Sequence, residues 1–300
     1  MGSRRRSAAL PLALGALIAG VGGVAAGLLL AGPGEDDSPP QRITTTPSER
    51  TKANRGGGTS TTRTTTPGGP SIRGEKARQA RIPILMYHVL GTPSGSSLPD
   101  LWVSKERFRE QMAALKAAGY QGITLKAAFG AWETGGPLPP KPVIVSFDDG
   151  YLSHATVAAP TLRKYGWPGV LNLELKNLGK DGLPRHLALE MANEGWEIDS
   201  HTLTHPDLRN VSAEQLKTEL DDSRVQIKQI FGTAPQYFCY PAGKYDARVI
   251  AAVKAAGYAG ATTVEPGLAG RSNGKYELPR VRITNADSGT GLVQRLRDAG

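Results

Sequence analysis

The 300-residue chain contains one cysteine, Cys239, and this scarcity excludes two classes of structure. A single cysteine cannot form a disulfide within the chain, and it cannot supply the ligands of a cysteine-rich zinc module. A lone cysteine is more often a small buried hydrophobic residue than a nucleophile. The sequence also has no internal repeat of the length found in solenoid proteins, which excludes that architecture.

The part of the chain that can fold lacks an excess of positive charge, although the whole chain carries a formal net charge of +9. Residues 1–81 hold 12 Lys and Arg against 5 Asp and Glu, whereas the remaining 219 residues hold 24 basic and 22 acidic groups. Nucleic-acid binding requires basic charge clustered on the folded domain. We therefore expect no nucleic-acid partner.

Residues 8–31 are almost wholly apolar and follow three arginines, Arg4 to Arg6. As a helix they would be about 36 Å long, enough to cross a bilayer core of about 30 Å, and the arginines would stay cytoplasmic. A cleavable signal peptide has a shorter apolar core of about 7–15 residues. We predict that residues 1–34 are an uncleaved, single-pass anchor in the cell membrane. Cleavage, which would release a secreted protein, is the alternative.

Residues 35–80 are rich in Pro, Gly, Thr, Ser and Arg and contain almost no large apolar side chain. Such a segment cannot bury a core. We predict a disordered linker that connects the anchor to a catalytic domain outside the membrane.

Residues 81–300 alternate short apolar runs with amphipathic stretches. The predicted strands are residues 82–87, 142–147, 170–173, 196–199, 237–240 and 259–263, and the predicted helices are residues 104–118, 154–165, 187–194, 212–230, 246–256 and 292–297. This alternation over about 220 residues indicates one α/β domain near the size range of (β/α) barrels.

Asp148 and Asp149 come directly after the clearest strand, residues 142–147. In an α/β barrel this is the end where catalytic groups collect. Two adjacent carboxylates point in different directions, so one can bind a metal ion while the other stays free. The alternative is an ordinary turn, because Asp-Gly is a common turn pair.

His201 and His205 are spaced i, i+4, which suits two metal ligands on one turn or one compact loop. A zinc protease would need Glu at position 202, and the residue there is Thr202. Together with Asp149, the two histidines would make three protein ligands and leave positions open for water and substrate.

Three further segments follow or form predicted strands. His88 ends the first strand, although a structural histidine is the commoner reading of such a residue. Residues 238–243 run into a Pro-Ala-Gly turn that can expose backbone N–H groups. Residues 278–283 contain Arg280, which could pair with a carboxylate, or they form a surface strand of alternating charge.

The segments Ser-Phe-Asp-Asp-Gly at 146–150 and His-Thr-Leu-Thr-His-Pro at 201–206 resemble the first two motifs of the polysaccharide deacetylases, the NodB-homology carbohydrate esterases of family 4. The resemblance covers about residues 81–285. It implies a distorted (β/α) barrel with fewer than eight strands, with Asp148 as general base. It also implies that Asp149, His201 and His205 bind a divalent metal, most often Zn²⁺, with Co²⁺, Ni²⁺ or Mn²⁺ as alternatives.

The chain departs from the common family pattern in its third motif and beyond. Cys239 stands where the family usually has Arg, and Ala242 replaces the usual Tyr. No Asp-x-x-Trp motif follows, and no histidine follows His205. Deacetylases acting on poly-N-acetylglucosamine have a Met-Tyr-His segment that supplies the acid, and residues 86–88 resemble it. The resemblance therefore implies His88 as general acid, with Arg280 as the candidate for the missing arginine.

The expected activity is removal of N-acetyl groups from amino sugars of a cell-wall or surface polysaccharide, by a monomeric catalytic domain. The backbone N–H near Ala242 would face the oxyanion that forms. One alternative is an esterase that removes O-acetyl groups. The alcohol part of an ester can leave without prior protonation, so this activity would not need the usual C-terminal histidine. Another is a non-catalytic glycan-binding domain that keeps the metal, although the intact Asp148 argues against it.

Overall fold

The computed structural model describes residues 70–93, 98–179 and 182–300. The predicted anchor, residues 1–34, and residues 35–69 of the predicted linker lie outside this part of the chain. Residues 70–80 lie within it: α1 (Gly74–Arg78) buries Ala77, and Ile72 pairs with Leu138. The ordered domain therefore starts before the predicted boundary at residue 81. Among the described residues, no helix combines the length and the apolar character that crossing a membrane requires.

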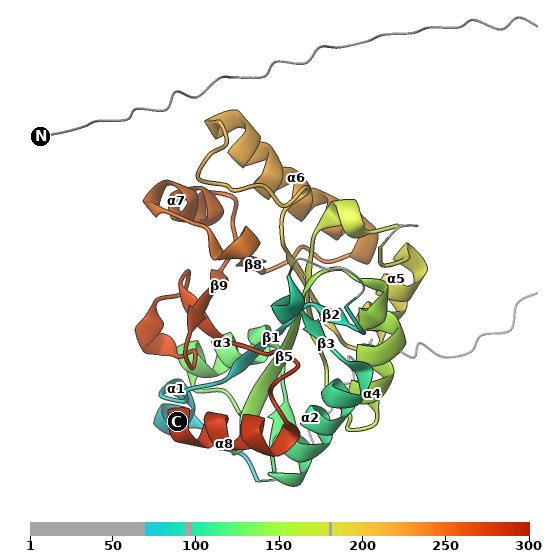
Figure 1. The fold of residues 1–300 in the computed structure, drawn as a ribbon. Coiled ribbons are helices and arrows are strands. Elements are labelled where there is room, and N and C mark those ends of the chain that lie inside the picture. Colours follow the sequence, from blue (N-terminus) through green and yellow to red (C-terminus); the bar gives the residue numbers. More distant parts are fainter. Residues whose placement is uncertain (1–69, 94–97, 180–181) are drawn as a thin grey trace, which may run out of the picture. The chain divides into compact units, whose positions relative to one another are not determined.

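Seven parallel strands of the described chain close into a barrel, with helices packed around it (Figure 1). They are β1 (Ile84–Tyr87), β5 (Pro142–Asp149), β6 (Val170–Leu173), β7 (Glu197–Ser200), β8 (Tyr237–Cys239), β9 (Gly260–Pro266) and β10 (Leu278–Arg282). The ring follows this order and closes where β10 pairs with β1. The short strand β4 (Gln121–Gly122) pairs with the start of β5 outside the ring. The predicted barrel of fewer than eight strands is confirmed.

The sequence explains why β5 lies at the centre of this arrangement. Its eight residues are all buried, and it pairs with β1, β4 and β6. A parallel strand covered on both faces needs the continuous apolar run that residues 142–147 provide. β10, in contrast, alternates in polarity, yet the side chain of Arg280 is buried inside the barrel. The reading of residues 278–283 as a surface strand is therefore wrong.

The helices lie outside the strands, and most of them begin at a Ser, Thr or Asp residue whose side chain caps the first turn. They are α2 (Lys105–Ala117), α3 (Leu125–Thr134), α4 (Ala159–Arg163), α5 (Arg185–Asn193), α6 (Ala213–Phe231), α7 (Ala247–Ala255) and α8 (Gly289–Ala299). Ser212, for example, accepts the N–H of Gln215 and starts α6. Two short strands, β2 (Val89–Leu90) and β3 (Trp102–Val103), follow β1 and pair with each other.

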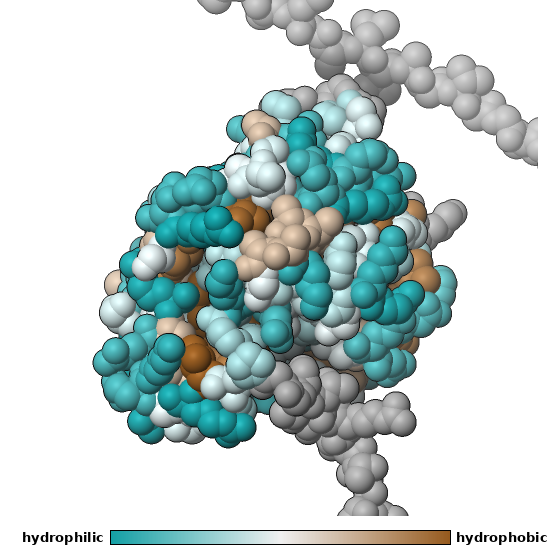
Figure 2. Space-filling model, turned by 90° about the horizontal axis from the view of Figure 1, so that it is seen from below, coloured by the Kyte–Doolittle hydropathy of each residue, from teal (hydrophilic) through white to brown (hydrophobic). Residues whose placement is uncertain are grey.

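Hydrophobic side chains are mainly inside. On the face drawn in Figure 2, hydrophilic residues predominate and hydrophobic ones occur in separate small patches. Among the described residues, the exposed large hydrophobic side chains are Leu98, Leu152 and Val225.

Helix α3, which the sequence pattern does not predict, closes the N-terminal end of the barrel. Phe129 on α3 stacks on Tyr237 with ring centroids 4.4 Å apart, and both belong to a core cluster with residues near the starts of several strands. Gly260 at the start of β9 leaves room for the Phe129 ring. The opposite, C-terminal end is therefore the one left for a site.

Replacement of Gly260 tests this closure. A Cβ atom there would lie 2.3 Å from Cζ of Phe129 and 2.6 Å from the carbonyl oxygen of Lys275. We expect Gly260→Ala to lower the free energy of unfolding by about 1–3 kcal/mol, because the packed core cannot accept the methyl group. The control is Gly130→Ala on α3, whose Cβ meets nothing within 4 Å and which should stabilise by about 0.5–1 kcal/mol. Urea denaturation measures both, and a Gly260→Ala protein as stable as wild type would contradict the packing described.

Candidate active site

The residues predicted to carry the chemistry lie at or near the C-terminal ends of the barrel strands. His88 follows β1, Asp148 and Asp149 end β5, His201 and His205 follow β7, Ala242 lies in the short helix η4 (Pro241–Gly243) after β8, and Arg280 lies within β10. Active sites of parallel α/β barrels are built at this end. Six of the seven residues are linked by contacts, whereas Ala242 makes no hydrogen bond with the other six in the described part of the chain.

Asp149 faces the two histidines of the second motif. Its Oδ1 lies 3.5 Å from Nε2 of His201 and 3.7 Å from Nε2 of His205. Donor atoms of a tetrahedral zinc ion, each about 2.0–2.1 Å from the metal, are about 3.3 Å apart. One ligand atom from each of these three side chains lies within 4.8 Å of the other two, so their spacing fits a divalent cation between them.

The tautomer of His201 also fits metal binding. Its Nδ1 donates a hydrogen bond to the carbonyl oxygen of Cys239 at 2.7 Å, so Nε2 is the atom that faces Asp149 and that a cation would bind in place of a proton. Burial alone would lower the pKa of His201, but Cys239 and Asp149 raise it well above its ordinary value. Burial alone would raise the pKa of Asp149, but the hydrogen bond and charge of His201 lower it to about 2. Positive charge beside Asp149 is therefore favoured.

The backbone around these ligands is strained. Within the described residues, the four non-glycine residues with positive φ are Asp149 (78°), Thr202 (74°), His205 (57°) and Ala242 (50°). This conformation costs a residue with a side chain of order 1–3 kcal/mol, and such residues cluster at functional sites. All four belong to the predicted motifs, so the surrounding structure must hold this part of the chain in place.

Asp148 lies in a different environment from its neighbour. It is buried, and Arg280 donates from Nη1 to Oδ1 and from Nη2 to Oδ2, each at 2.8 Å. Asn172 also donates to Oδ1, at 2.7 Å. Burial alone would raise the pKa of this carboxyl, but the charge and hydrogen bonds of Arg280 hold it well below its ordinary value. The two adjacent carboxylates are thus separated into one that faces histidines and one that faces a guanidinium.

Arg280 is itself fixed by the barrel. It is 1% exposed, its Nε donates to the carbonyl oxygen of Thr263 at 2.7 Å, and its Nη1 lies 3.4 Å from Oγ of Ser146. The guanidinium therefore presents a rigid fork to Asp148, the geometry in which arginine binds carboxylates most strongly.

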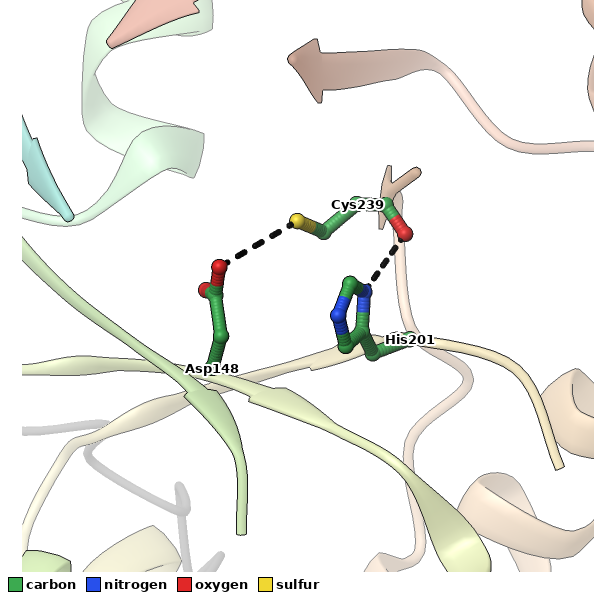
Figure 3. A group of neighbouring side chains, drawn as sticks. All are labelled: Asp148, His201 and Cys239. Carbon is green, nitrogen blue, oxygen red and sulfur yellow. Dashed lines mark hydrogen bonds between the residues drawn. The ribbon is translucent and has the colours of Figure 1, made fainter. Parts of the chain in front are cut away.

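Cys239 joins the two halves of the site (Figure 3). Its Sγ lies 3.8 Å from Oδ2 of Asp148, while its carbonyl oxygen accepts the hydrogen bond from His201. Asp148, His201 and Cys239 also come close enough to form a second candidate ligand set. A cation there would lie against the charge of Arg280, which already occupies both oxygens of Asp148. This second set therefore does not fit a metal ion.

His88 borders Asp148 from the other side. Its Nε2 lies 3.7 Å from Oδ2 of Asp148, and burial lowers its pKa, so the ring is neutral near pH 7. The backbone of His88 is held in place by His154, because the carbonyl oxygen of His88 accepts a hydrogen bond from Nε2 of this buried residue at 2.7 Å. His154, interpreted from the sequence as an ordinary helix or loop residue, thus positions a site residue.

Three residues of the site were not singled out from the sequence. Asn172 stands out in the predicted strand 170–173 as a polar residue in an apolar run, and this signal could have identified it. His154 offered only its position a few residues after Gly150. Glu219, which binds the loop between His201 and His205, lies in a predicted amphipathic helix where a charged residue is ordinary.

Known proteins resemble this chain in sequence and in fold. A family model described as polysaccharide deacetylase matches residues 135–261. The protein YxkH of Bacillus subtilis (strain 168), which is named for the same family, is 35% identical over 216 residues, or 72% of this chain and 76% of YxkH. The poly-beta-1,6-N-acetyl-D-glucosamine N-deacetylase of Escherichia coli (strain K12) is 41% identical over 68 residues, or 23% of this chain and 10% of that enzyme.

A solved structure agrees with these matches. The Streptococcus pyogenes deacetylase PplD, in complex with acetate, aligns with a TM-score of 0.68 and 27% identity over 72% of this chain and 98% of PplD. Because YxkH is matched over most of its length at 35% identity, the chain belongs to the polysaccharide deacetylase family.

Proposed function

We propose that this deacetylase depends on a divalent metal ion and removes N-acetyl groups from amino-sugar residues of a cell-wall or surface polysaccharide, releasing acetate. The observation that carries the proposal is the separation of the adjacent carboxylates, with Asp149 facing two imidazoles and Asp148 bound by Arg280. A metal site for structure alone would have no use for a second carboxylate, Asp148, that faces away from the two imidazoles.

Asp149, His201 and His205 would hold the metal ion. When bound, the ion would polarise the acetyl carbonyl and lower the pKa of water toward neutrality. Zn²⁺ is our first choice, and Co²⁺, Ni²⁺ and Mn²⁺ are the alternatives, because two histidines and one carboxylate accept several divalent ions.

Asp148 acts as the general base in this proposal. Oδ1 accepts from Arg280 and Asn172, whereas Oδ2 accepts from Arg280 and only weakly from the thiol of Cys239, at 3.8 Å. We therefore assign the proton of the attacking water to Oδ2. Because Arg280 holds the pKa of Asp148 low, the carboxylate is ionised and ready at any pH near neutrality. Arg280 keeps it aimed in one direction.

The leaving amine also needs a proton, because an amide nitrogen is a poor leaving group. We assign this role to His88, whose ring is neutral at rest and lies 3.7 Å from Oδ2 of Asp148. The water oxygen bonds to the acetyl carbon, and its proton passes through Asp148 and His88 to the sugar nitrogen as the C–N bond breaks. The backbone N–H of Ala242, in its exposed strained turn, is our candidate donor to the oxyanion.

Poly-N-acetylglucosamine and peptidoglycan are the polymers that we consider first. The match to an enzyme named for poly-beta-1,6-N-acetyl-D-glucosamine, short as it is, supports the former. PplD was solved with acetate, which is the product proposed for this chain. We further propose that a monomeric catalytic domain stands outside the cell membrane on the predicted anchor, residues 8–31. The apolar run and the arginines before it support this placement.

An O-acetyl esterase is the second candidate. The lowered pKa of His88 favours this activity. The ring is neutral near pH 7, and the alcohol part of an ester can leave without receiving a proton from an acid.

Acetate release tests the proposed activity. We expect the full-length protein to release acetate from N-acetylglucosamine oligomers, peptidoglycan or poly-N-acetylglucosamine, to lose the activity with a chelator and to regain it with Zn²⁺ or Co²⁺. Asp148→Asn should lower kcat by about 10²–10⁴-fold while metal content stays unchanged, because only the base is lost. Asp149→Asn, the adjacent control, should lose metal. An Asp148→Asn enzyme with wild-type turnover would contradict the assignment of the base.

Replacement of His88 separates amide from ester chemistry. His88→Ala should lower kcat on an N-acetylated oligosaccharide by about 10²–10⁴-fold and leave hydrolysis of an aryl acetate nearly unchanged, because the phenolate leaves without a proton. His186→Ala, an exposed histidine on α5, is the control and should match wild type on both substrates. Equal losses on the two substrates would mean that His88 does not protonate the leaving group.

The ion pair of Arg280 also makes a prediction for stability. Arg280→Leu should lower the free energy of unfolding of the metal-free protein by about 3–5 kcal/mol at pH 7, because it leaves the buried carboxylate of Asp148 unpaired. The pKa of Asp148 is depressed in the folded protein, so the pair stabilises fully above the ordinary pKa of 3.8 and progressively less below it. Without Arg280, burial raises the pKa of Asp148 above 3.8, so the difference from wild type should shrink as the pH falls and the unpaired carboxylate of the variant takes up a proton.

Denaturant titrations at pH 7 and at about pH 3.5 measure this difference. The double variant Asp148→Asn/Arg280→Leu is the control, and it should be more stable than Arg280→Leu because no buried charge is left alone. A difference that does not depend on pH would show that the loss comes from packing and not from the ion pair.

A further inference from the structure

The loop between His201 and His205 has an unusual way of satisfying its backbone. The N–H of His201 donates to the carbonyl oxygen of Leu173 and continues the sheet. The next four N–H groups all donate to side-chain oxygens: Thr202 to Ser200, Leu203 and Thr204 to Glu219, and His205 to Thr202. Buried N–H groups must find acceptors, and here the loop takes them from side chains because it belongs to neither a helix nor a strand.

Glu219 on α6 supplies the central acceptor. Its Oε2 accepts the N–H of Leu203 at 2.8 Å and that of Thr204 at 3.1 Å, and its Oε1 accepts the hydroxyl of Thr204 at 2.5 Å. The residue is 4% exposed, and in the described part of the chain no Lys or Arg forms an ion pair with it. Burying a carboxylate without a cation costs free energy, and the three hydrogen bonds from Leu203 and Thr204 offset that cost for Glu219.

A second residue of α6 strengthens this contact. Ser223 lies one helical turn after Glu219 and is hydrogen-bonded to Oγ of Ser200 at 2.9 Å, at the start of the loop. Residues at i and i+4 lie on the same face of a helix. One face of α6 therefore binds the loop at two points.

The two strained residues of the loop flank the backbone that Glu219 binds. Thr202 has φ of 74° and His205 has φ of 57°, and the N–H groups of Leu203 and Thr204 lie between them. Without an acceptor for these groups, either residue could relax to negative φ, and the relaxation would move the imidazole of His205 relative to Asp149.

The two histidines depend on this contact unequally. His201 is attached to β7 and is fixed independently by its hydrogen bond to Cys239. The side chain of His205 is 32% exposed and comes after the strained segment, so its position depends on the loop.

We propose that Glu219 is a positioning residue of the metal site: from α6 it holds the loop in the strained conformation that brings His205 to Asp149, and so sets the affinity for the metal ion. The proposal rests on the proposed function only in that Asp149, His201 and His205 bind the metal. Outer residues that orient metal ligands typically change metal affinity by about 10–100-fold.

The test uses the full-length protein with Glu219→Ala, Glu219→Gln, His205→Ala and the double variant His205→Ala/Glu219→Ala. The control is Asp222→Asn, which removes an exposed carboxylate from the same helix. Dissociation constants for Zn²⁺ are measured against a competing chelator, and the Tm of each metal-free protein reports folding.

We expect Glu219→Ala to weaken Zn²⁺ binding by about 10–100-fold and Asp222→Asn to leave it unchanged. Glu219→Gln should bind nearly as well as wild type, because its amide oxygen can still accept both N–H groups and its amide nitrogen can donate to Thr204. The double variant should bind no more weakly than His205→Ala, because Glu219 acts through His205.

Two results would overturn the proposal. One is wild-type Zn²⁺ affinity in a folded Glu219→Ala protein. The other is an equal loss with and without His205, which would mean a general structural effect. If Glu219→Ala does not fold, Glu219→Leu provides the same test, since it fills the space without an acceptor.

Amide hydrogen exchange separates this proposal from the proposed function. In the metal-free protein, the amide hydrogens of Leu203 and Thr204 should exchange faster in Glu219→Ala than in wild type. Unchanged exchange would show that Glu219 does not protect these two N–H groups in solution. A wild-type protein that binds no Zn²⁺ would instead refute the metal site, whatever the exchange shows.

Discussion

The site depends on the buried ion pair between Asp148 and Arg280. Removing two charges from water costs more than a loose contact returns, so such a pair persists only with good geometry and satisfied neighbours. Here the geometry is a two-point fork, and Asn172, Thr263 and Ser146 complete it. The pair separates two adjacent, chemically identical side chains, because it holds Asp148 against a guanidinium and leaves Asp149 to face the histidines.

The residues around the pair fix both halves of the site through a few shared contacts. Cys239 contacts Asp148 with its sulfur and His201 with its carbonyl oxygen, so one residue of β8 links the two side chains. Two helical residues hold other parts of the site: His154 binds the backbone of His88, and Glu219 binds the loop that leads to His205. The strained backbone of the motifs is therefore stabilised by side chains that belong to the scaffold.

Much of this could be predicted from the sequence because strand ends in a parallel barrel converge. The run at 142–147 predicted β5, and the residues after it had to lie at the C-terminal end together with those after β7. Arg280 was predicted to pair with a carboxylate, and it does, across 132 positions of sequence. Residues 70–80 resemble the linker in composition, and the sequence therefore did not reveal that Ala77 of α1 belongs to the same core cluster as residues of β1 and β5.

The rest was hidden for physical reasons. Helix α3 contains a glycine and has no regular pattern of charged residues, so the sequence pattern does not predict it. Its role in closing the barrel follows only from the contact of Phe129 with Tyr237. Glu219 lies 16 positions from Leu203, and a glutamate in an amphipathic helix normally faces water. β10 alternates in polarity because one of its three buried residues, Arg280, is charged, and the periodicity of the sequence alone therefore predicts a surface strand.

The place of Arg280 in the chain has a consequence for the order in which the enzyme is made. The carboxylate of Asp148 emerges from the ribosome long before the guanidinium that neutralises it, since β10 is the last strand of the ring. Domains fold as units during synthesis, and the ring cannot close before β10 is present. A nascent or truncated chain carries both sequence motifs but has no partner for its central charge. Completion of the chain is therefore the step that turns the motifs into a working hydrolase.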